Sequence, residues 1–245
     1  MFPGFGTLVN VITVIVGSAI GLLLGHRLPE RTRDTVTDAL GLVTLLIGGL
    51  SALEVTGTVL SDAVGDSAPV LIVLGALLVG GILGSLIDIE QRLEDLGVWL
   101  QYRFRARGNQ ARFVEAFVSS SLVFCVGPLT ILGSVSDGLG LGSEQLLLKA
   151  TLDGFAAIAF AASLGVGVMA SALAVGVIQG SLTLVGALVG DVLPAAHLAA
   201  ITATGGLLLV GVGLRLLKIK AVPVGNLLPA LLVAPLLVQL VVVLR

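Results

Sequence analysis

The sequence predicts an all-helical integral membrane protein with about eight transmembrane helices. Of its 245 residues, 56% are hydrophobic and only 11% are charged, with a mean hydropathy of +1.13, whereas a soluble domain carries about 25% charged residues. Between Asp153 and Asp191 lie 37 consecutive residues without a charge. As one helix they would be about 55 Å long, nearly twice the roughly 30 Å of a bilayer's hydrocarbon core. This stretch therefore predicts two spans that reverse near Ser163–Ser171.

The eight expected spans are the apolar segments between clusters of charge, and each is near the ~20 residues that a crossing needs. They are Phe5–Gly25, Ala39–Thr56, Pro69–Ile87, Phe113–Val135, Ala150–Val168, Ser171–Val189, Leu198–Leu217 and Val222–Leu240. The N-terminal segment has no basic residue before it, and Met1 to Gly25 carries no charge. It therefore predicts a first span rather than a cleaved signal peptide. Together the segments predict a single transmembrane domain over residues 1–245.

The charges between the segments predict the orientation of the spans. Basic residues follow the first, third and seventh spans: Arg27, Arg31, Arg33, Arg92, Arg103, Arg105, Arg107, Arg112, Arg215, Lys218 and Lys220. The other loops are mainly acidic. With both termini extracytoplasmic, 11 of the 13 Lys and Arg residues lie in the cytoplasm, as the positive-inside rule requires. A seven-span alternative would place Arg215 and the two following lysines outside, so we reject it.

Residues 88–112 predict an amphipathic helix and a basic loop on the cytoplasmic surface. Apolar residues recur at helical spacing, at Ile89, Leu93, Leu96, Leu100 and Phe104, and the only Trp (Trp99) and only Tyr (Tyr102) lie in the same stretch. Such a helix lies along the membrane interface and anchors the protein. The alternative is a binding site for lipid headgroups or an anionic partner at the basic tract Arg103–Arg107. We favour the anchoring helix.

An internal repeat links spans 1 and 2 with spans 6 and 7. Gly17, Gly21, Leu28-Pro29, Gly41-Leu42 and Gly48 match Gly186, Gly190, Leu193-Pro194, Gly206-Leu207 and Gly213 after one four-residue deletion. A shift of five spans is odd, so the two copies would cross the membrane in opposite directions, as in the inverted repeats of many transporters. The alternative is coincidence, because 33 residues are Gly.

Among the polar residues inside the expected spans, where lipid makes them costly and function is the default hypothesis, four are the candidate ligands. Asp153 lies about one turn into span 5 and shares a helix face with Lys149, four residues earlier. It is the candidate charged ligand, and a purely structural pair with Lys149 is the alternative. Asn10, Gln179 and Asn226 are candidate neutral ligands. For these three the alternative is a hydrogen bond between helices.

Span 4 contains the candidate backbone site. Pro128 cannot donate a backbone hydrogen bond and crowds the carbonyl of Phe124, so with Gly127 it predicts a kink or break. Carbonyls near Cys125, with the hydroxyls of Ser120 and Thr130, could then coordinate a cation or small polar solute. A simple proline kink without a ligand is the alternative.

Several function classes lack support in the sequence. His26 and His197 lie at opposite faces of the predicted membrane domain, and there is one Cys. We find no metal-ligand spacing, no catalytic triad and no phosphate-binding loop. The sequence therefore predicts no enzyme, cofactor or metal. Its basic residues sit in short clusters between spans, which argues against a nucleic-acid partner.

Three stretches resemble a known family: Gly6–Asn10, Phe124–Leu139 and Lys149–Phe155. They are similar to the YqgA/YdfK-like family of uncharacterised bacterial integral membrane proteins, and the resemblance extends over nearly the whole chain. It implies a multi-pass protein of the bacterial plasma (inner) membrane. It implies no substrate.

We expect transport or conduction of a small solute or ion, with the lipid bilayer as surroundings. Glycines spaced by four, as at Gly17/Gly21/Gly25, Gly80/Gly84 and Gly176/Gly180, indicate closely packed helix faces. These faces could also support a homo-oligomer. The alternative function is a non-transporting scaffold or regulatory protein that acts through such faces and the basic cytoplasmic surface.

Overall fold

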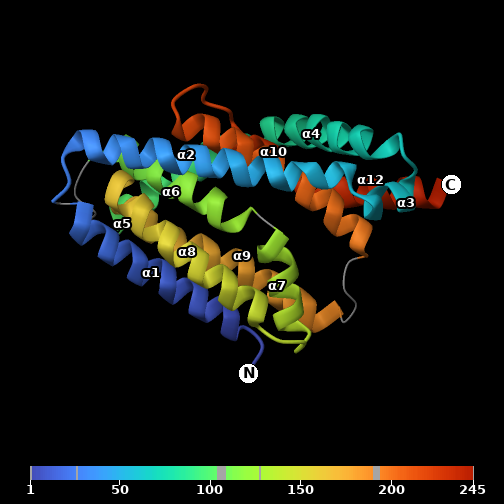
Figure 1. Ribbon diagram of the computed structural model, residues 1–245, viewed down its shortest axis with the longest axis horizontal. Helices are drawn as coiled ribbons and strands as arrows, with labels where there is room; N and C mark the ends of the chain where they lie inside the picture. Colours follow the sequence, from blue (N-terminus) through green and yellow to red (C-terminus); the bar gives the residue numbers. More distant parts are fainter. Residues whose placement is uncertain (1, 26, 104–108, 127, 190–193, 245) are drawn as a thin grey trace. The chain divides into compact units, whose positions relative to one another are not determined.

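The computed structural model describes residues 2–25, 27–103, 109–126, 128–189 and 194–244, and over these residues the chain is helical without strands. The helices are α1 (Phe5–Gly25), α2 (Glu30–Ala52), η1 (Leu53–Thr56), α3 (Thr58–Val64), α4 (Ala68–Ile87), α5 (Ile89–Arg103), α6 (Gln110–Cys125), α7 (Pro128–Gly138), α8 (Glu144–Leu164), α9 (Gly167–Val189), α10 (Ala195–Leu216), α11 (Val224–Leu227) and α12 (Ala230–Leu244). Figure 1 labels most of them.

Seven stretches of the described chain are long and apolar enough to cross a membrane, and the bent pair α6 and α7 would be an eighth. The first stretch, Phe5–Gly25, has the predicted bounds. Span 5 is longer than predicted, because α8 begins at Glu144 and not at Ala150. The reversal after α8 occurs at Gly165, whose φ of +98° suits glycine, so Ser171 lies within α9 and not in the turn.

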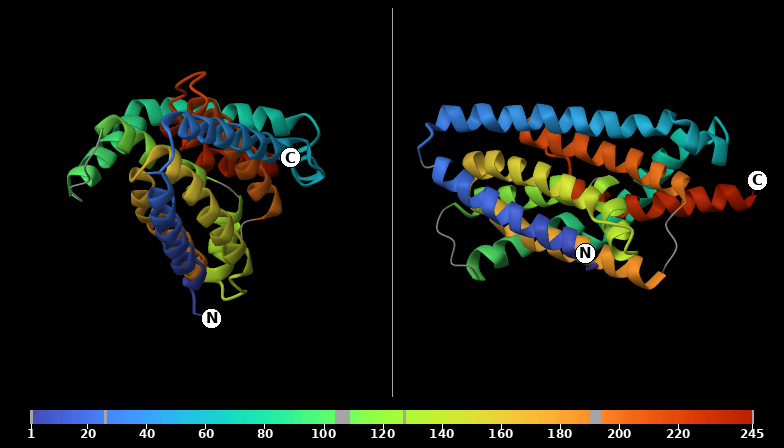
Figure 2. Two further views of the ribbon diagram at one scale, coloured as in Figure 1. Left: turned by 60° about the vertical axis from the view of Figure 1, so that its left-hand side comes forward. Right: turned by 60° about the horizontal axis from the view of Figure 1, so that its bottom comes forward.

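The chain forms two compact units. Unit 1 contains residues 1–41 and 94–192, and unit 2 contains residues 42–93 and 193–245. In unit 1, α1, α8, α9 and the α6–α7 pair pack together, and Figures 1 and 2 draw α1 (blue) beside α8 (yellow) in every view. In unit 2, α10 packs against α12, α3 and α4 around a core of small and branched apolar side chains: Leu60, Val64, Ile72, Ala76, Ala199, Ala200, Ala230, Ala234 and Val238.

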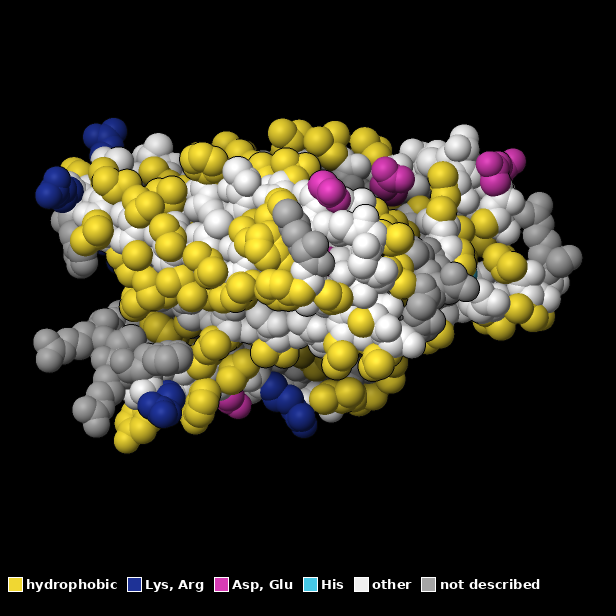
Figure 3. Space-filling model, turned by 90° about the horizontal axis from the view of Figure 1, so that it is seen from below, with side chains coloured by type: hydrophobic (Ala, Val, Ile, Leu, Met, Phe, Trp, Pro, Cys, Tyr) yellow, Lys and Arg dark blue, Asp and Glu magenta, His cyan; other side chains and the backbone are white. Residues whose placement is uncertain are grey.

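Large apolar side chains remain exposed along these helices. Leu23 of α1 is 71% exposed and Leu86 of α4 is 79% exposed, and hydrophobic side chains spread over much of the face drawn in Figure 3. Apolar exposure of this extent marks a surface that water does not face. Together with the apolar lengths of the helices, this exposed apolar surface indicates a membrane protein.

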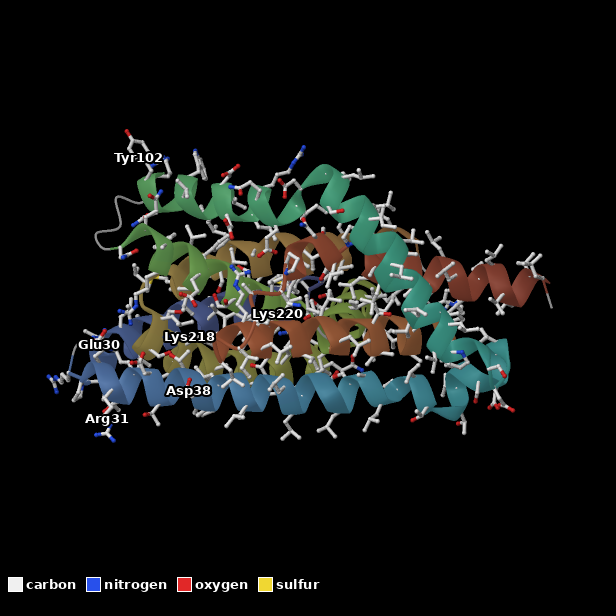
Figure 4. All side chains as sticks on the ribbon, turned by 90° about the horizontal axis from the view of Figure 1, so that it is seen from above. Glu30, Arg31, Asp38, Tyr102, Lys218 and Lys220 are labelled. Carbon is white, nitrogen blue, oxygen red and sulfur yellow. The ribbon has the colours of Figure 1, made fainter. Side chains whose placement is uncertain are left out.

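Helix α5 corresponds to the predicted amphipathic helix, but its buried face differs in part from the prediction. Leu100 is buried, whereas Leu96 is 42% exposed, and Gly97 lies against Phe117 of α6. Trp99 and Tyr102 are exposed. Figure 4 shows Tyr102 pointing outward near the end of α5, as expected of an interfacial anchor. The rest of the basic tract and Phe104, within residues 104–108, lie outside the described residues.

Candidate functional site

The centre of the candidate site is an ion pair on α8. Lys149 Nζ donates a hydrogen bond to Asp153 Oδ2 one helical turn away, and the two residues are only 6% and 7% exposed. Because α8 begins at Glu144, Asp153 is the tenth of its 21 residues. The sequence placed Asp153 about one turn into a span that begins at Ala150, whereas the helix itself begins earlier, at Glu144. The pair lies near the middle of a helix long enough to cross a bilayer.

Asn10 of α1 joins this pair. Its side chain is fully buried, and Nδ2 donates a hydrogen bond of 2.9 Å to the same Asp153 oxygen that Lys149 binds. Asn10 Oδ1 is buried and accepts no hydrogen bond from the described residues. Asn10 Oδ1 is therefore a buried hydrogen-bond acceptor beside the Asp153 carboxylate, and no described residue donates a hydrogen bond to it.

Glycines of α1 allow this close approach to α8. A Cβ added at Gly17 would lie 2.4 Å from the carbonyl oxygen of Gly154, and one at Gly21 would lie 2.2 Å from that of Ile158. At Gly25 the corresponding distance to the carbonyl oxygen of Ala162 is 2.6 Å. The predicted glycine face is confirmed for α1, and the order of these contacts makes α1 and α8 parallel.

The break between α6 and α7 lies beside the ion pair. Phe124, just before the break, meets Phe160 of α8 edge to face, with ring centroids 6.0 Å apart. Gly133, in the second turn of α7, lies against Leu146 of α8. Lys149 and Asp153 lie between these two contact points along α8. Cys125 is the last residue of α6 and lies at this break.

The predicted break in span 4 is confirmed by the two separate helices, whose axes differ by 62°. Pro128 is the first residue of α7, a position at which the missing N–H is not needed. Thr130 Oγ1 donates to the carbonyl oxygen of Phe124 at 3.2 Å, so a side chain satisfies one backbone acceptor that the break exposes. Gly127 and the side chain of Pro128 lie outside the described residues.

Gln179 of α9 lies at the level of Asn10. On either side of it, Gly176 packs on Val11 and the Thr183 hydroxyl lies 3.4 Å from that of Thr7, so α9 runs antiparallel to α1. Gln179 is fully buried, and neither its Oε1 nor its Nε2 has a hydrogen-bond partner among the described residues. We refer to Asn10, Cys125, Lys149, Asp153 and Gln179 as the polar layer.

The serines of α6 divide into two groups. Ser120 Oγ donates to the carbonyl of Ala116 at 2.6 Å, within its own helix. The buried hydroxyls of Ser119 and Ser121, and that of Ser134 on α7, have no partner in the described part of the chain. Ser134 was missed from the sequence because no spacing sets it apart from other serines in apolar spans.

Asn226, the remaining candidate, lies in unit 2 and has a structural role there. It belongs to α11, and its Oδ1 accepts a hydrogen bond of 2.8 Å from the backbone N–H of Glu90 in the first turn of α5. Glu90 in turn binds Arg215 and accepts a hydrogen bond from the Gly225 N–H at 2.6 Å. The structure therefore places Asn226 in a hydrogen-bonded cluster of unit 2 with Glu90, Arg215 and Gly225.

Two apolar pockets of unit 1, of about 330 and 410 Å³, open beside α1. The first is lined by Ile15, Phe113 and Met169 among others, and the second by Ile12 and Phe155 among others. Neither is lined by Asp153. The polar layer is thus enclosed by helices and does not form the floor of these pockets.

Comparisons with known proteins place the chain in a family. A family model described as "Protein of unknown function (DUF554)" matches residues 5–239. The chain is 33% identical over 232 residues to the uncharacterised protein YqgA of Escherichia coli (strain K12), covering 94% of each chain. It is 30% identical over 234 residues to the uncharacterised membrane protein YdfK of Bacillus subtilis (strain 168), covering 96% of this chain and 95% of the relative. No solved structure matches. The resemblance to the YqgA/YdfK-like proteins is therefore confirmed, and this membrane protein belongs to the DUF554 family of proteins of unknown function.

Proposed function

We propose that the protein transports or conducts a small solute or ion, and that the polar layer of unit 1 is its binding site. One observation carries the proposal: helices otherwise lined by apolar side chains bring a buried acid, a buried base and two buried amides to one level. Burying such groups in a membrane costs several kcal/mol each unless they are paired. Several of their atoms have no partner among the described residues, so packing alone does not account for them. A binding site for a small solute or ion would supply the missing partners.

The proposal includes the topology. We propose eight spans, with α6 and α7 as one broken span, both termini outside, and location in a bacterial inner membrane. The support is the distribution of basic residues, 11 of 13 on the cytoplasmic side. A broken span is tolerated at membrane depth where it is enclosed by protein or lines a polar cavity, and the α6–α7 break lies against α8 and α9. We propose transport, and not catalysis, as the activity of the protein.

An inverted repeat is part of the same proposal. If span 1 corresponds to span 6 and span 2 to span 7, each of these spans packs antiparallel against its counterpart. Within unit 1, α1 meets α9 in this way. Within unit 2, Gly48 of α2 lies against Val210 of α10, and Gly206 of α10 lies against Ala52 of α2. A two-fold axis in the membrane plane would produce such pairs. The repeat positions Gly190 and Leu193 lie outside the described residues.

A second candidate function is a scaffold or regulatory protein that assembles through its helix faces. The observation that favours it is Gly180 of α9, because a Cβ added there would meet no described atom within 4 Å. Gly180 therefore does not serve a helix contact within the described chain. A second copy of the chain could pack on this face, giving a homo-oligomer.

The test is a flux assay with the purified full-length protein in liposomes. The panel comprises monovalent cations, phosphate, amino acids and polyols. Uptake of each solute is measured with an ion electrode, with an isotope label or by the recovery of liposome volume. We expect flux of at least one class above that of protein-free liposomes. Asp153→Asn and Gln179→Leu should lower it by about tenfold or more because they remove polar-layer groups.

Matched controls are Asp38→Asn and Gln239→Leu, which make the same changes at exposed positions; Figure 4 labels Asp38 on α2. They should leave the flux unchanged. Wild-type protein that is folded and monodisperse, yet passes no member of the panel, would refute the proposal. Flux that survives Asp153→Asn and Gln179→Leu would show that the path lies elsewhere.

A further inference from the structure

The first apolar pocket of unit 1, of about 330 Å³, is large enough to hold a small ligand or part of a larger one. Every residue that lines it has an apolar side chain, and the lining comes from α1, α6, α9 and the turn before α9, among them Val11, Ile15, Phe113, Val166, Met169 and Leu173. Ile15 and Leu173 are exposed, so the pocket is open to the surroundings of these helices. Its occupant is therefore apolar where it contacts the protein.

The pocket begins at one end of the membrane-length helices and extends toward their middle. Gly167 is the first residue of α9, and Leu173 lies six residues further on, about 9 Å along the helix. On the other side of the pocket, Val11 and Ile15 belong to the middle turns of α1. The apolar surface thus runs in the direction in which a lipid chain enters a bilayer.

Arg112 lies at the outer end of this pocket. It precedes Phe113, which lines the pocket, and a Cβ added at Gly167 would lie 2.2 Å from the carbonyl oxygen of Phe113. Arg112 Nη2 donates a hydrogen bond of 2.6 Å to the carbonyl of Ser163, the residue before the last of α8. A helix of 21 residues is about 30 Å long and spans the hydrocarbon core. The guanidinium is therefore held at the level of the lipid headgroups.

The positive charge of Arg112 has no partner of opposite sign within the described residues. The residue is exposed, and the described ion pairs join Lys149 with Asp153 and Arg215 with Glu90. Glu115, three residues further along α6, forms no ion pair with Arg112. The bond to Ser163 uses one N–H of a guanidinium that carries several, and their planar arrangement suits a phosphate.

We propose that Arg112 and the first apolar pocket form a binding site for one anionic phospholipid. The phosphate binds the Arg112 guanidinium, and one acyl chain lies in the pocket. The charged group and the apolar surface follow each other in the order in which a phospholipid presents its phosphate and its chain. In the proposed topology this end of α8 is cytoplasmic, the side on which anionic lipids attract basic residues. The site is distinct from the polar layer and does not depend on transport.

The second apolar pocket provides an internal comparison. It has a similar volume, about 410 Å³, and lies between α1 and α8, where Ile12 and Ile158 are among its lining residues. The basic residue next to its lining in the sequence, Lys149, is buried and paired with Asp153. This pocket therefore offers apolar surface without an available positive charge, and we expect no preference for an anionic lipid there.

The test is native mass spectrometry of the full-length protein in detergent. An equimolar mixture of phosphatidylglycerol and phosphatidylethanolamine with the same chains is added, and the first bound lipid is identified. We expect a preference for phosphatidylglycerol of about fivefold, the size expected of one arginine near an anionic headgroup. Inorganic phosphate at the same concentration should displace little lipid because it has no chain. Equal binding of the two lipids, or full displacement by phosphate, would overturn the proposal.

Substitutions at Arg112 test the charged part of the site. Arg112→Gln removes the charge but keeps an N–H for the carbonyl of Ser163, and it should abolish the preference for phosphatidylglycerol. Arg112→Lys keeps the charge and should retain most of the preference. The matched control is Arg31→Gln, at an exposed position labelled in Figure 4, which should behave as wild type. An unchanged preference in Arg112→Gln, or an equal loss in Arg31→Gln, would contradict the site.

A substitution in the pocket tests the apolar part. Val166→Phe adds bulk at a half-buried lining position and should weaken the binding of both lipids by about tenfold, as if roughly two CH₂ groups of the chain were no longer buried. The matched control is Ile158→Phe, at a half-buried position of the second pocket, which should leave the first bound lipid unchanged. Equal effects of the two variants would refute a chain in the first pocket. The comparison of the two lipids on the wild type decides the proposal even if a variant does not fold.

Discussion

Asn10 of α1 and Asp153 of α8, 143 residues apart in the chain, are joined by a hydrogen bond of 2.9 Å from Nδ2 to Oδ2. This contact ties the first membrane helix to the centre of a helix from the second half of the sequence. It also orients the Asn10 amide, because using Nδ2 for Asp153 leaves Oδ1 turned away from that carboxylate. Its consequences can be tested by substitution.

Replacing Asn10 should destabilise the contact between α1 and α8. We expect Asn10→Leu to lower the free energy of unfolding by about 0.6–1.7 kcal/mol, the range from the average to the largest value for hydrogen bonds between membrane helices. Asn10→Asp should cost more, because two carboxylates would then face each other. Thermal unfolding in detergent measures both. Equal stability of wild type and Asn10→Asp would contradict the contact.

Removing only the positive charge of the pair should destabilise the protein more than removing both charges. Lys149→Met leaves a buried carboxylate unpaired, which costs about 3–5 kcal/mol in other buried pairs. The double variant Lys149→Met/Asp153→Leu should recover most of that loss, because two apolar side chains replace the pair. A double-mutant cycle by chemical denaturation measures the difference. Additive losses would show that the two charges do not interact.

Adding a side chain to the glycine face of α1 should separate it from α8. At Gly21 an added Cβ would lie 2.2 Å from a backbone oxygen, so Gly21→Leu cannot be accommodated without a shift of the helices. We expect loss of the folded, monodisperse protein on gel filtration. Gly49→Leu, at a position where an added Cβ meets no described atom within 4 Å, is the control. Similar behaviour of the two variants would rule out the close contact.

The cluster in unit 2 should contribute stability without contributing to flux. Glu90 accepts hydrogen bonds from Arg215 and from the Gly225 N–H, and charged hydrogen bonds are worth about 1.5–3 kcal/mol each. Glu90→Ala should therefore lower the unfolding temperature while any flux per folded molecule stays unchanged. Glu30→Ala, at an exposed position labelled in Figure 4, is the control. A selective loss of flux would move the transport site to unit 2.

Local patterns in the sequence predict much of the helical framework. The length of the apolar segment and the absence of charge predict the span Phe5–Gly25, which has the bounds of α1. The missing N–H of Pro128 predicts the break between α6 and α7. These features depend on residues that are neighbours in the chain. The predicted start of α8 is too late because hydropathy assigns the charged residues Glu144 and Lys149 to a loop.

The composition of the polar layer depends on contacts that no local pattern contains. Nothing near Asn10 indicates that it meets Asp153, and nothing near Gln179 indicates that it reaches the level of Asn10. Asn226 resembles both as a polar residue in an apolar stretch, yet it binds the Glu90 N–H in unit 2. Separating such residues requires the order in which helices pack. A single transmembrane domain over residues 1–245 stays a prediction.

The ion pair of α8 also bears on how the protein is made. Lys149 and Asp153 are one turn apart on the same helix, so they can neutralise each other as soon as that helix forms. The part of the helix that contains the pair can then enter the bilayer without net charge before α9 has been synthesised, and Glu144 in the first turn is the remaining charge of α8. The charges that are expensive to insert singly thus travel together, and membrane insertion of α8 does not have to wait for a partner helix.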